Sequence, residues 1–172
     1  MNIEKALLAD PVQSRQMALR VADYACTDEE TFSELMQCYF SDHYRLAQRA
    51  AYSAGIAAKK RPDMIQPYIG KLAVCLTRKD VHDAVIRNCV RILENVSIPE
   101  VFHAEVMNAC FDLAADRMVP VAISALSLTV LYRLSLIYPE IKKELRIIIE
   151  EGMEFEKAAF RSRGKKILAL IK

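Results

Sequence analysis

Residues 83–116 have the sequence DAVIRNCVRILENVSIPEVFHAEVMNACFDLAAD, and this stretch decides the fold. Apolar residues recur every three or four positions on both sides of Pro99, which is the spacing of amphipathic helices. The proline marks a turn, because it lacks the N–H that a continuing helix needs. We therefore expect one helix, a turn and a second helix that returns beside the first.

The same outline recurs along the chain with a period of about 37 residues, the length of one helical-hairpin repeat. Turn prolines stand 37 and 40 residues apart, at Pro62, Pro99 and Pro139. Cysteines stand 37 and 35 residues apart, at Cys38, Cys75 and Cys110. No stretch alternates apolar and polar residues in the manner of a strand. The sequence predicts an all-α fold, an α-α superhelix of about four helical hairpins plus a terminal half repeat. It forms a single domain over residues 1–172.

Capping residues and prolines predict where the helices begin. Thr27 with Glu30 has the spacing of a capping box, and Pro11 suits the first turn of a helix that runs to about Cys26. A short helix over residues 2–9 precedes them. The expected starts are Pro11, Thr27, Asp42, Asp63, Asp80 or Asp83, Pro120, Glu140 and Lys157. The third helix is rich in small residues, and its Gly55 allows a neighbouring helix to approach closely.

Composition narrows the class of protein. The 172 residues carry a net charge of +2, which argues against a dedicated nucleic-acid binder. No apolar run reaches the roughly 18 residues that span a bilayer, and the N-terminus lacks the pattern of a signal peptide. Five scattered cysteines without a C-x-x-C pair indicate reduced thiols. We expect a cytoplasmic protein that does not contact membranes.

Two stretches resemble a known family. Asp83 is followed by Val85, Cys89 and Leu93, which stand four residues apart, and this pattern resembles the second helix of a HEAT repeat. Residues 120–123, with the sequence PVAI, are similar to armadillo-like segments of adaptin type. The resemblance covers most of the chain. It implies a right-handed superhelix that binds a protein partner along its concave face and has no catalytic role.

Residues that could carry catalysis are few. The three histidines, His43, His82 and His103, are isolated, whereas a zinc site usually has four ligands. Phosphate-cradling glycine loops and the motifs of hydrolases and metalloproteases are absent from the sequence. We therefore expect no catalytic residues, no metal and no cofactor. A small enzyme with an unrecognised site is the third and weakest hypothesis.

Basic residues are the best candidates for a binding site. Stacked repeats bring equivalent positions into line, so the basic residues of the outgoing helices form a stripe that attracts carboxylates or phosphates. The candidate basic stripe consists of Arg45, Arg49, Arg87, Arg91, Arg161 and Lys165. The alternative is that these side chains pair with neighbouring acids or keep the surface soluble.

A second functional hypothesis is nucleic-acid binding, in the manner of the HEAT-like DNA glycosylases. Those proteins are similar in architecture and place aromatic residues, commonly tryptophan, around a catalytic aspartate. This chain has no tryptophan, so the protein-binding hypothesis is preferred.

Overall fold

Every regular element in residues 1–171, the part of the chain that the computed structural model describes, is helical. The predicted all-α class is confirmed. The chain divides into two compact units, Met1–Ser97 and Ile98–Lys172. The expectation that both units form a single domain stays a prediction. The last helix was expected to end at Lys172, a residue that lies outside the described range.

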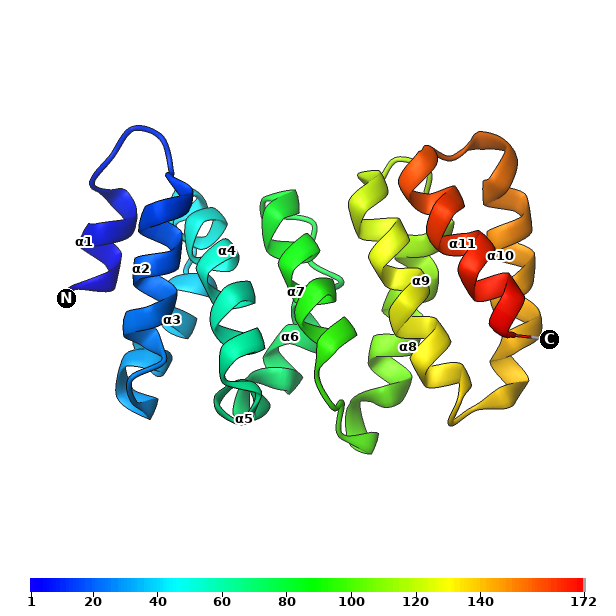
Figure 1. The fold of residues 1–172 in the computed structure, drawn as a ribbon, viewed down its shortest axis with the longest axis horizontal. Helices are drawn as coiled ribbons and strands as arrows, with labels where there is room; N and C mark the ends of the chain where they lie inside the picture. The colour runs from blue at the N-terminus through cyan, green and yellow to red at the C-terminus, as the bar shows by residue number, and fades with distance from the viewer. Residues whose placement is uncertain (172) are drawn as a thin grey trace. The chain divides into compact units, whose positions relative to one another are not determined.

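The first unit is a row of helices backed by a second set (Figure 1). In the row, α4 lies between α2 and α7, while α3 packs behind α4 and α6 behind α7. The terminal helix α1 packs against α2, α3 and α4. The helices of this unit are α1 (Ile3–Leu8), α2 (Arg15–Ala25), α3 (Glu29–Tyr39), α4 (Tyr44–Lys60), α5 (Pro62–Ile65), α6 (Ile69–Cys75) and α7 (Asp83–Asn95).

The second unit is built around α9, which packs against α8, α10 and α11. Its core includes Leu128, Leu131 and Phe160, all fully buried. The helices of this unit are α8 (His103–Ala115), α9 (Val121–Ser135), α10 (Lys142–Phe155) and α11 (Ala158–Leu170). Short 3-10 turns, Glu100–Phe102 and Pro139–Ile141, precede α8 and α10.

Helix pairing corrects one sequence prediction. Residues 83–116 were expected to form a single hairpin, but the boundary between the two units falls inside this stretch, after Ser97. Helix α7 pairs with the preceding α6 and with α4, and α8 pairs with the following α9. The apolar face of α7 is covered within its own unit, where Val85, Cys89 and Leu93 are buried. The repeat period was correct, while the assignment of helices to hairpins was shifted by one helix.

Several predicted helix starts are displaced by a few residues. Pro11 was expected in the first turn of α2, but that helix begins at Arg15 with Ser14 as its cap, and Asp28 and Thr31 form the capping box of α3. The Thr27 hydroxyl donates to the Tyr24 carbonyl at the end of α2, 2.8 Å away, and the Thr31 N–H is accepted by Asp28. Histidines replace the expected aspartates at two further starts. His43 caps α4 and His82 caps α7, each accepting a backbone N–H through Nδ1.

Pro67 interrupts the helix that was expected to run on from Asp63. The segment is instead α5, a 3-10 turn over Gln66–Tyr68, and then α6. Proline lacks an N–H and its ring clashes with the preceding turn, so the α-helical hydrogen-bond ladder cannot pass through this position unchanged.

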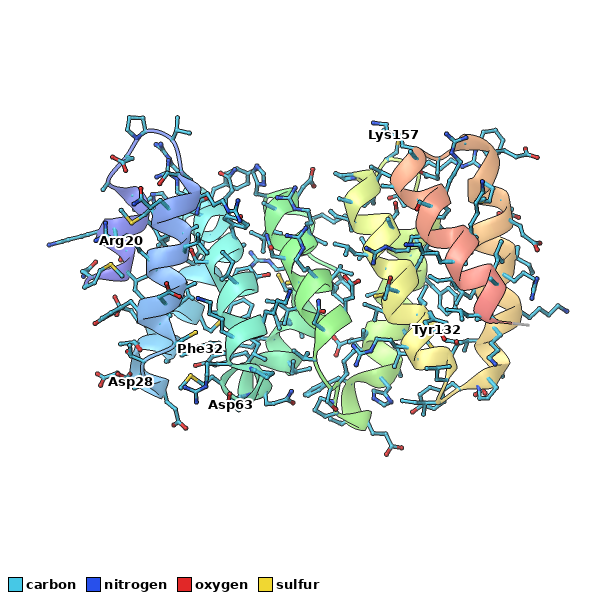
Figure 2. The ribbon with its side chains drawn as sticks, viewed as in Figure 1. Arg20, Asp28, Phe32, Asp63, Tyr132 and Lys157 are labelled. Carbon is cyan, nitrogen blue, oxygen red and sulfur yellow. The ribbon has the colours of Figure 1, made fainter. Side chains whose placement is uncertain are left out.

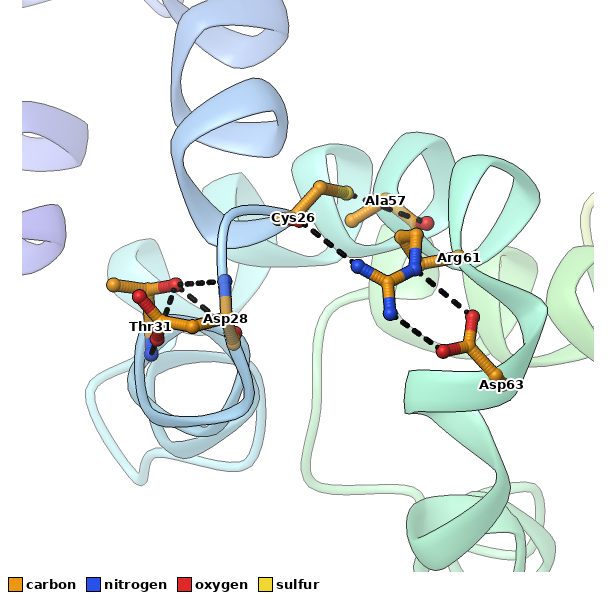
Figure 3. A network of polar contacts seen from close by, with 6 residues as sticks. All are labelled: Cys26, Asp28, Thr31, Ala57, Arg61 and Asp63. Carbon is orange, nitrogen blue, oxygen red and sulfur yellow. Dashed lines mark hydrogen bonds and ion pairs between the residues drawn. The ribbon is translucent and has the colours of Figure 1, made fainter.

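Arg61 joins two turns at one end of the first unit (Figure 3). Its guanidinium donates to both carboxylate oxygens of Asp63, at 3.0 and 2.6 Å, and to the Cys26 carbonyl at 3.2 Å. The hydrogen bonds from Arg61 lower the pKa of Asp63. Figure 2 shows Asp28 and Phe32 at the same end of the unit as Asp63. The contact fixes the turn after α4 against the end of α2.

The close contact between α10 and α11 generates a stability prediction. A methyl group on Gly152 would overlap the buried ring of Phe160, whose Cζ would lie 2.7 Å from the added carbon. Alanine normally stabilises a helix relative to glycine by about 1 kcal/mol, but overpacking costs about 1–3 kcal/mol. We expect Gly152→Ala to lower the melting temperature in thermal denaturation. Combining it with Phe160→Leu should cost less than the sum of the two single changes. A higher melting temperature for Gly152→Ala alone would contradict the packing.

Candidate functional site

A groove of about 470 Å³ lies between α4 and α7 in the first unit. We call it the α4–α7 groove. Its lining residues are Tyr52, Gly55, Ile56, Lys59 and Lys60 from α4, with Asn88 and Arg91 from α7. The α4 residues lie three or four positions apart, which places them on one face of the helix. The two α7 residues are three positions apart, and they form the opposite wall for the same reason.

Gly55 and Asn88 form the floor of the groove. Asn88 is 1% exposed, and its Nδ2 donates to the Ala84 carbonyl at 2.8 Å. Its Oδ1 is buried and has no hydrogen-bond partner within residues 1–171. A Cβ on residue 55 would lie 2.9 Å from this oxygen, so a larger residue at this position would force the asparagine side chain to shift. The prediction that Gly55 allows a close helix approach is confirmed.

The rim of the groove carries positive charge. Lys59 and Arg91 are exposed, and no side-chain ion pair or hydrogen bond of either is found within the described part of the chain. Lys60 forms an ion pair with Asp23 of α2, and this hydrogen bond raises the pKa of Lys60. None of the lining residues is acidic. The groove thus combines an apolar wall with two cations that are available to a ligand.

Two of the predicted stripe residues hold the fold together. Arg49 is 5% exposed and donates to three backbone carbonyls: Leu7 at 2.5 Å, and Asp10 and Pro11 each at 2.8 Å. Carbonyls at the end of a helix lack intrahelical partners, and the guanidinium supplies the donors for α1 and its following loop. Arg45 is exposed and donates to the same loop, at the Pro11 carbonyl. Both side chains therefore face the α1–α2 connection.

The other four stripe residues lie near the surface. Arg87 and Arg91 are one turn apart on α7; Arg87 is half-buried and its Nε has no partner within residues 1–171. Arg161 and Lys165 are exposed and one turn apart on α11, in the second unit. The structure brings Arg91, but not the other three, into the α4–α7 groove. A partner-binding role for the stripe stays a prediction.

The sequence reasoning missed the α4 wall of the groove. Tyr52, Ile56 and Lys59 stand at helical spacing, and this signal was present in the sequence. It was overlooked because only the buried side of this helix was considered. The helix was expected to run to roughly Lys60, and α4 does end at Lys60, so both lysines project from its last turn.

Cysteines and histidines have structural surroundings. Burial raises the pKa of Cys38 to about 11 and that of Cys110 to about 12. His103 contacts the Tyr138 hydroxyl through Nδ1 and the Ile98 carbonyl through Nε2, at 3.0 and 2.7 Å. Over residues 1–171, no three His, Cys, Asp or Glu side chains gather as a metal site would require. None of the helices in this range has the length and apolar composition needed to cross a membrane.

Rows of paired helices are typical of helical-repeat proteins. A family model described as a HEAT repeat domain matches residues 5–171, nearly the entire chain. The protein therefore belongs to the HEAT repeat family. No curated protein and no solved structure matches it. HEAT repeats generally mediate protein interactions, and the family is generally non-catalytic.

The contrast between two arginines can be tested by unfolding. Arg49→Ala removes donors from three carbonyls, and we expect it to lower the free energy of unfolding by about 2–4 kcal/mol. Arg91→Ala is the matched control on an exposed position, and its effect should stay within about 0.5 kcal/mol. Urea denaturation followed by circular dichroism measures both. Equal effects of the two variants would contradict the structural role of Arg49.

Thiol labelling can test the burial of the cysteines. Cys26 is partly exposed, with burial raising its pKa, while the remaining four cysteines are buried. Because the thiolate is the reactive species, we expect a maleimide to modify Cys26 first in the native protein. The others should react only on unfolding in denaturant. Mass spectrometry of the labelled protein reads the site, and early labelling of Cys89 or Cys110 would contradict the packing.

Proposed function

We propose that this chain is a non-catalytic HEAT interaction or scaffold module. In each HEAT repeat the second helix of the pair lines the concave side of the stack. The module binds a protein partner along the face that these second helices form. In the first unit this face is formed by α2, α4 and α7. Membership of the HEAT family supports a binding role, and the α4–α7 groove supplies a defined place for it.

The α4–α7 groove is the observation that carries the proposal. Tyr52 and Ile56 give it apolar surface, and aromatic residues and arginine are enriched where proteins bind each other. Arg91 stands at its edge without an ion-pair partner among the described residues. A surface of this kind can bury an apolar side chain of a partner while its rim selects for charge.

Protein is preferred to nucleic acid as the ligand. Neutralising a phosphate backbone requires many cations in line, and the net charge of the chain is only +2. Within the first unit, Arg49 and Lys60 are already engaged with other groups, so the predicted stripe does not form a continuous row of available cations. Arg87, Arg161 and Lys165 remain predicted contributors to partner binding, and a cytoplasmic location remains a prediction too.

Site-specific photo-crosslinking tests the proposal. A benzophenone amino acid replaces Ile56 in the groove or, as a control, Val74 of α6, which is 56% exposed. In extract of the native cell we expect irradiation to link the chain to a discrete protein from position 56 and not from position 74. The readout is the mass-shifted band and its tryptic peptides.

Three outcomes would contradict this function. Equal crosslinking from positions 56 and 74 would indicate non-specific contact. Crosslinks to nucleic acid alone, with a gel shift of DNA that weakens steeply above about 50 mM salt, would favour the alternative of a nucleic-acid-binding protein. The absence of any crosslink from position 56 would remove the groove as the binding place.

A further inference from the structure

The charge of the α4–α7 groove has one sign. Lys59 projects from one wall and Arg91 from the other. Lys60 is a third cation, and it forms an ion pair with Asp23. With no acid in the lining, the two available cations repel each other and are not neutralised inside the protein. An occupant with negative charge removes this repulsion. An arginine also offers a planar set of donors that suits a carboxylate.

Between the cations the groove is apolar. Ile56 and the ring of Tyr52 are both half-exposed, and Gly55 leaves the floor without a side chain. An isolated phosphate or a small carboxylate would leave this apolar surface in water. An occupant that places an apolar side chain next to its negative charge would cover it, at a gain of about 25 cal/mol per Å² buried.

The floor of the groove is a close contact between Gly55 and Asn88. Within residues 1–171, Asn88 Oδ1 is buried and has no hydrogen-bond partner. Its orientation follows from the amide nitrogen, which donates to the Ala84 carbonyl. The oxygen is closed to solvent, so an occupant of the groove covers this floor without a hydrogen bond to it. The close contact between Gly55 and Asn88 thus shapes the groove, while the rim cations and the apolar wall select the occupant.

We propose that the α4–α7 groove binds an acidic peptide segment of a partner protein. A carboxylate of the segment lies between Lys59 and Arg91, and a neighbouring apolar side chain packs on Tyr52 and Ile56. The backbone of the segment passes over the floor formed by Gly55 and Asn88. This inference rests on the proposed protein-binding function and adds the chemical class of the partner.

Synthetic peptides test the inference with the full chain. The probe is a rhodamine-labelled peptide, SGELEEGS, and its neutral match is SGQLQQGS. Fluorescence anisotropy should show binding of the acidic peptide that weakens with salt and little binding of the neutral one. The double variant Lys59→Ala/Arg91→Ala should weaken binding about fivefold or more. The control Arg20→Ala/Lys79→Ala removes the same charge from exposed positions outside the groove and should leave binding unchanged.

A second measurement locates the peptide. In ¹H–¹⁵N NMR spectra, the acidic peptide should shift the amide signals of Gly55 and Ile56 and the side-chain amide of Asn88. Gly55→Ala should weaken binding by displacing Asn88 from the floor, and a thermal melt checks that this variant folds.

Four results would overturn the inference. In the anisotropy measurement these are equal affinities for the two peptides and an equal loss of affinity in the two double variants. In the NMR spectra they are signal shifts confined to residues outside the groove, and larger shifts of the groove signals with inorganic phosphate or a DNA oligonucleotide than with the acidic peptide. The proposed function is judged separately. A protein crosslinked from position 56, together with no affinity for the acidic peptide, would keep the interaction module and reject only the acidic partner.

Discussion

The first unit depends on the close packing of other helices against α4. This helix contacts α1, α2, α3, α5 and α7, and its buried surface is made largely of alanine. Small side chains allow neighbouring backbones to approach closely. The large side chains that fill the core therefore come from the neighbouring helices, such as Phe32 and Tyr39 of α3. Tyr39 spans the interior, with its hydroxyl donating to the Val85 carbonyl at 2.8 Å. The packing leaves α4 with one open strip, which becomes a wall of the α4–α7 groove.

That strip explains why the groove has both an apolar wall and a charged rim. One face of α4 is not covered by α2, α3 or α7. It carries larger side chains in place of alanine, namely Tyr52, Ile56 and Lys59. Gly55 lies where the open face meets α7. The Asn88 side chain occupies the space that a side chain on residue 55 would need. The same residue therefore sets the distance between the helices and leaves the groove open above the asparagine.

Arginines at equivalent positions have different roles because of their neighbours. Arg49 and Arg91 were placed in one stripe, since both lie on outgoing helices of the repeat. The loop after α1 covers Arg49 and offers three carbonyls to it, whereas Arg91 faces the open groove. A guanidinium can be buried only where several hydrogen-bond acceptors lie in the plane of its N–H groups and take the place of water. Periodicity locates a residue on a helix face, but it does not report what another segment places over that face.

The sequence alone determined the all-α class, the repeat period and the approximate helix positions. Prolines and apolar spacing act within one or two turns, so they can be recognised locally. The cap residues were harder to predict, because neighbouring polar side chains such as Thr27 and Asp28 can both act as caps, and the sequence does not show that Thr27 bonds to the end of α2 while Asp28 caps α3. Only the tertiary structure decided that α7 pairs with α6, that Arg49 is buried, and that Lys59 faces Arg91 across a groove. These features depend on contacts between different helices, and both the carbonyls bonded to Arg49 and the Arg91 side chain opposite Lys59 are more than thirty positions away in the sequence. A local sequence pattern does not show which distant segment packs against it.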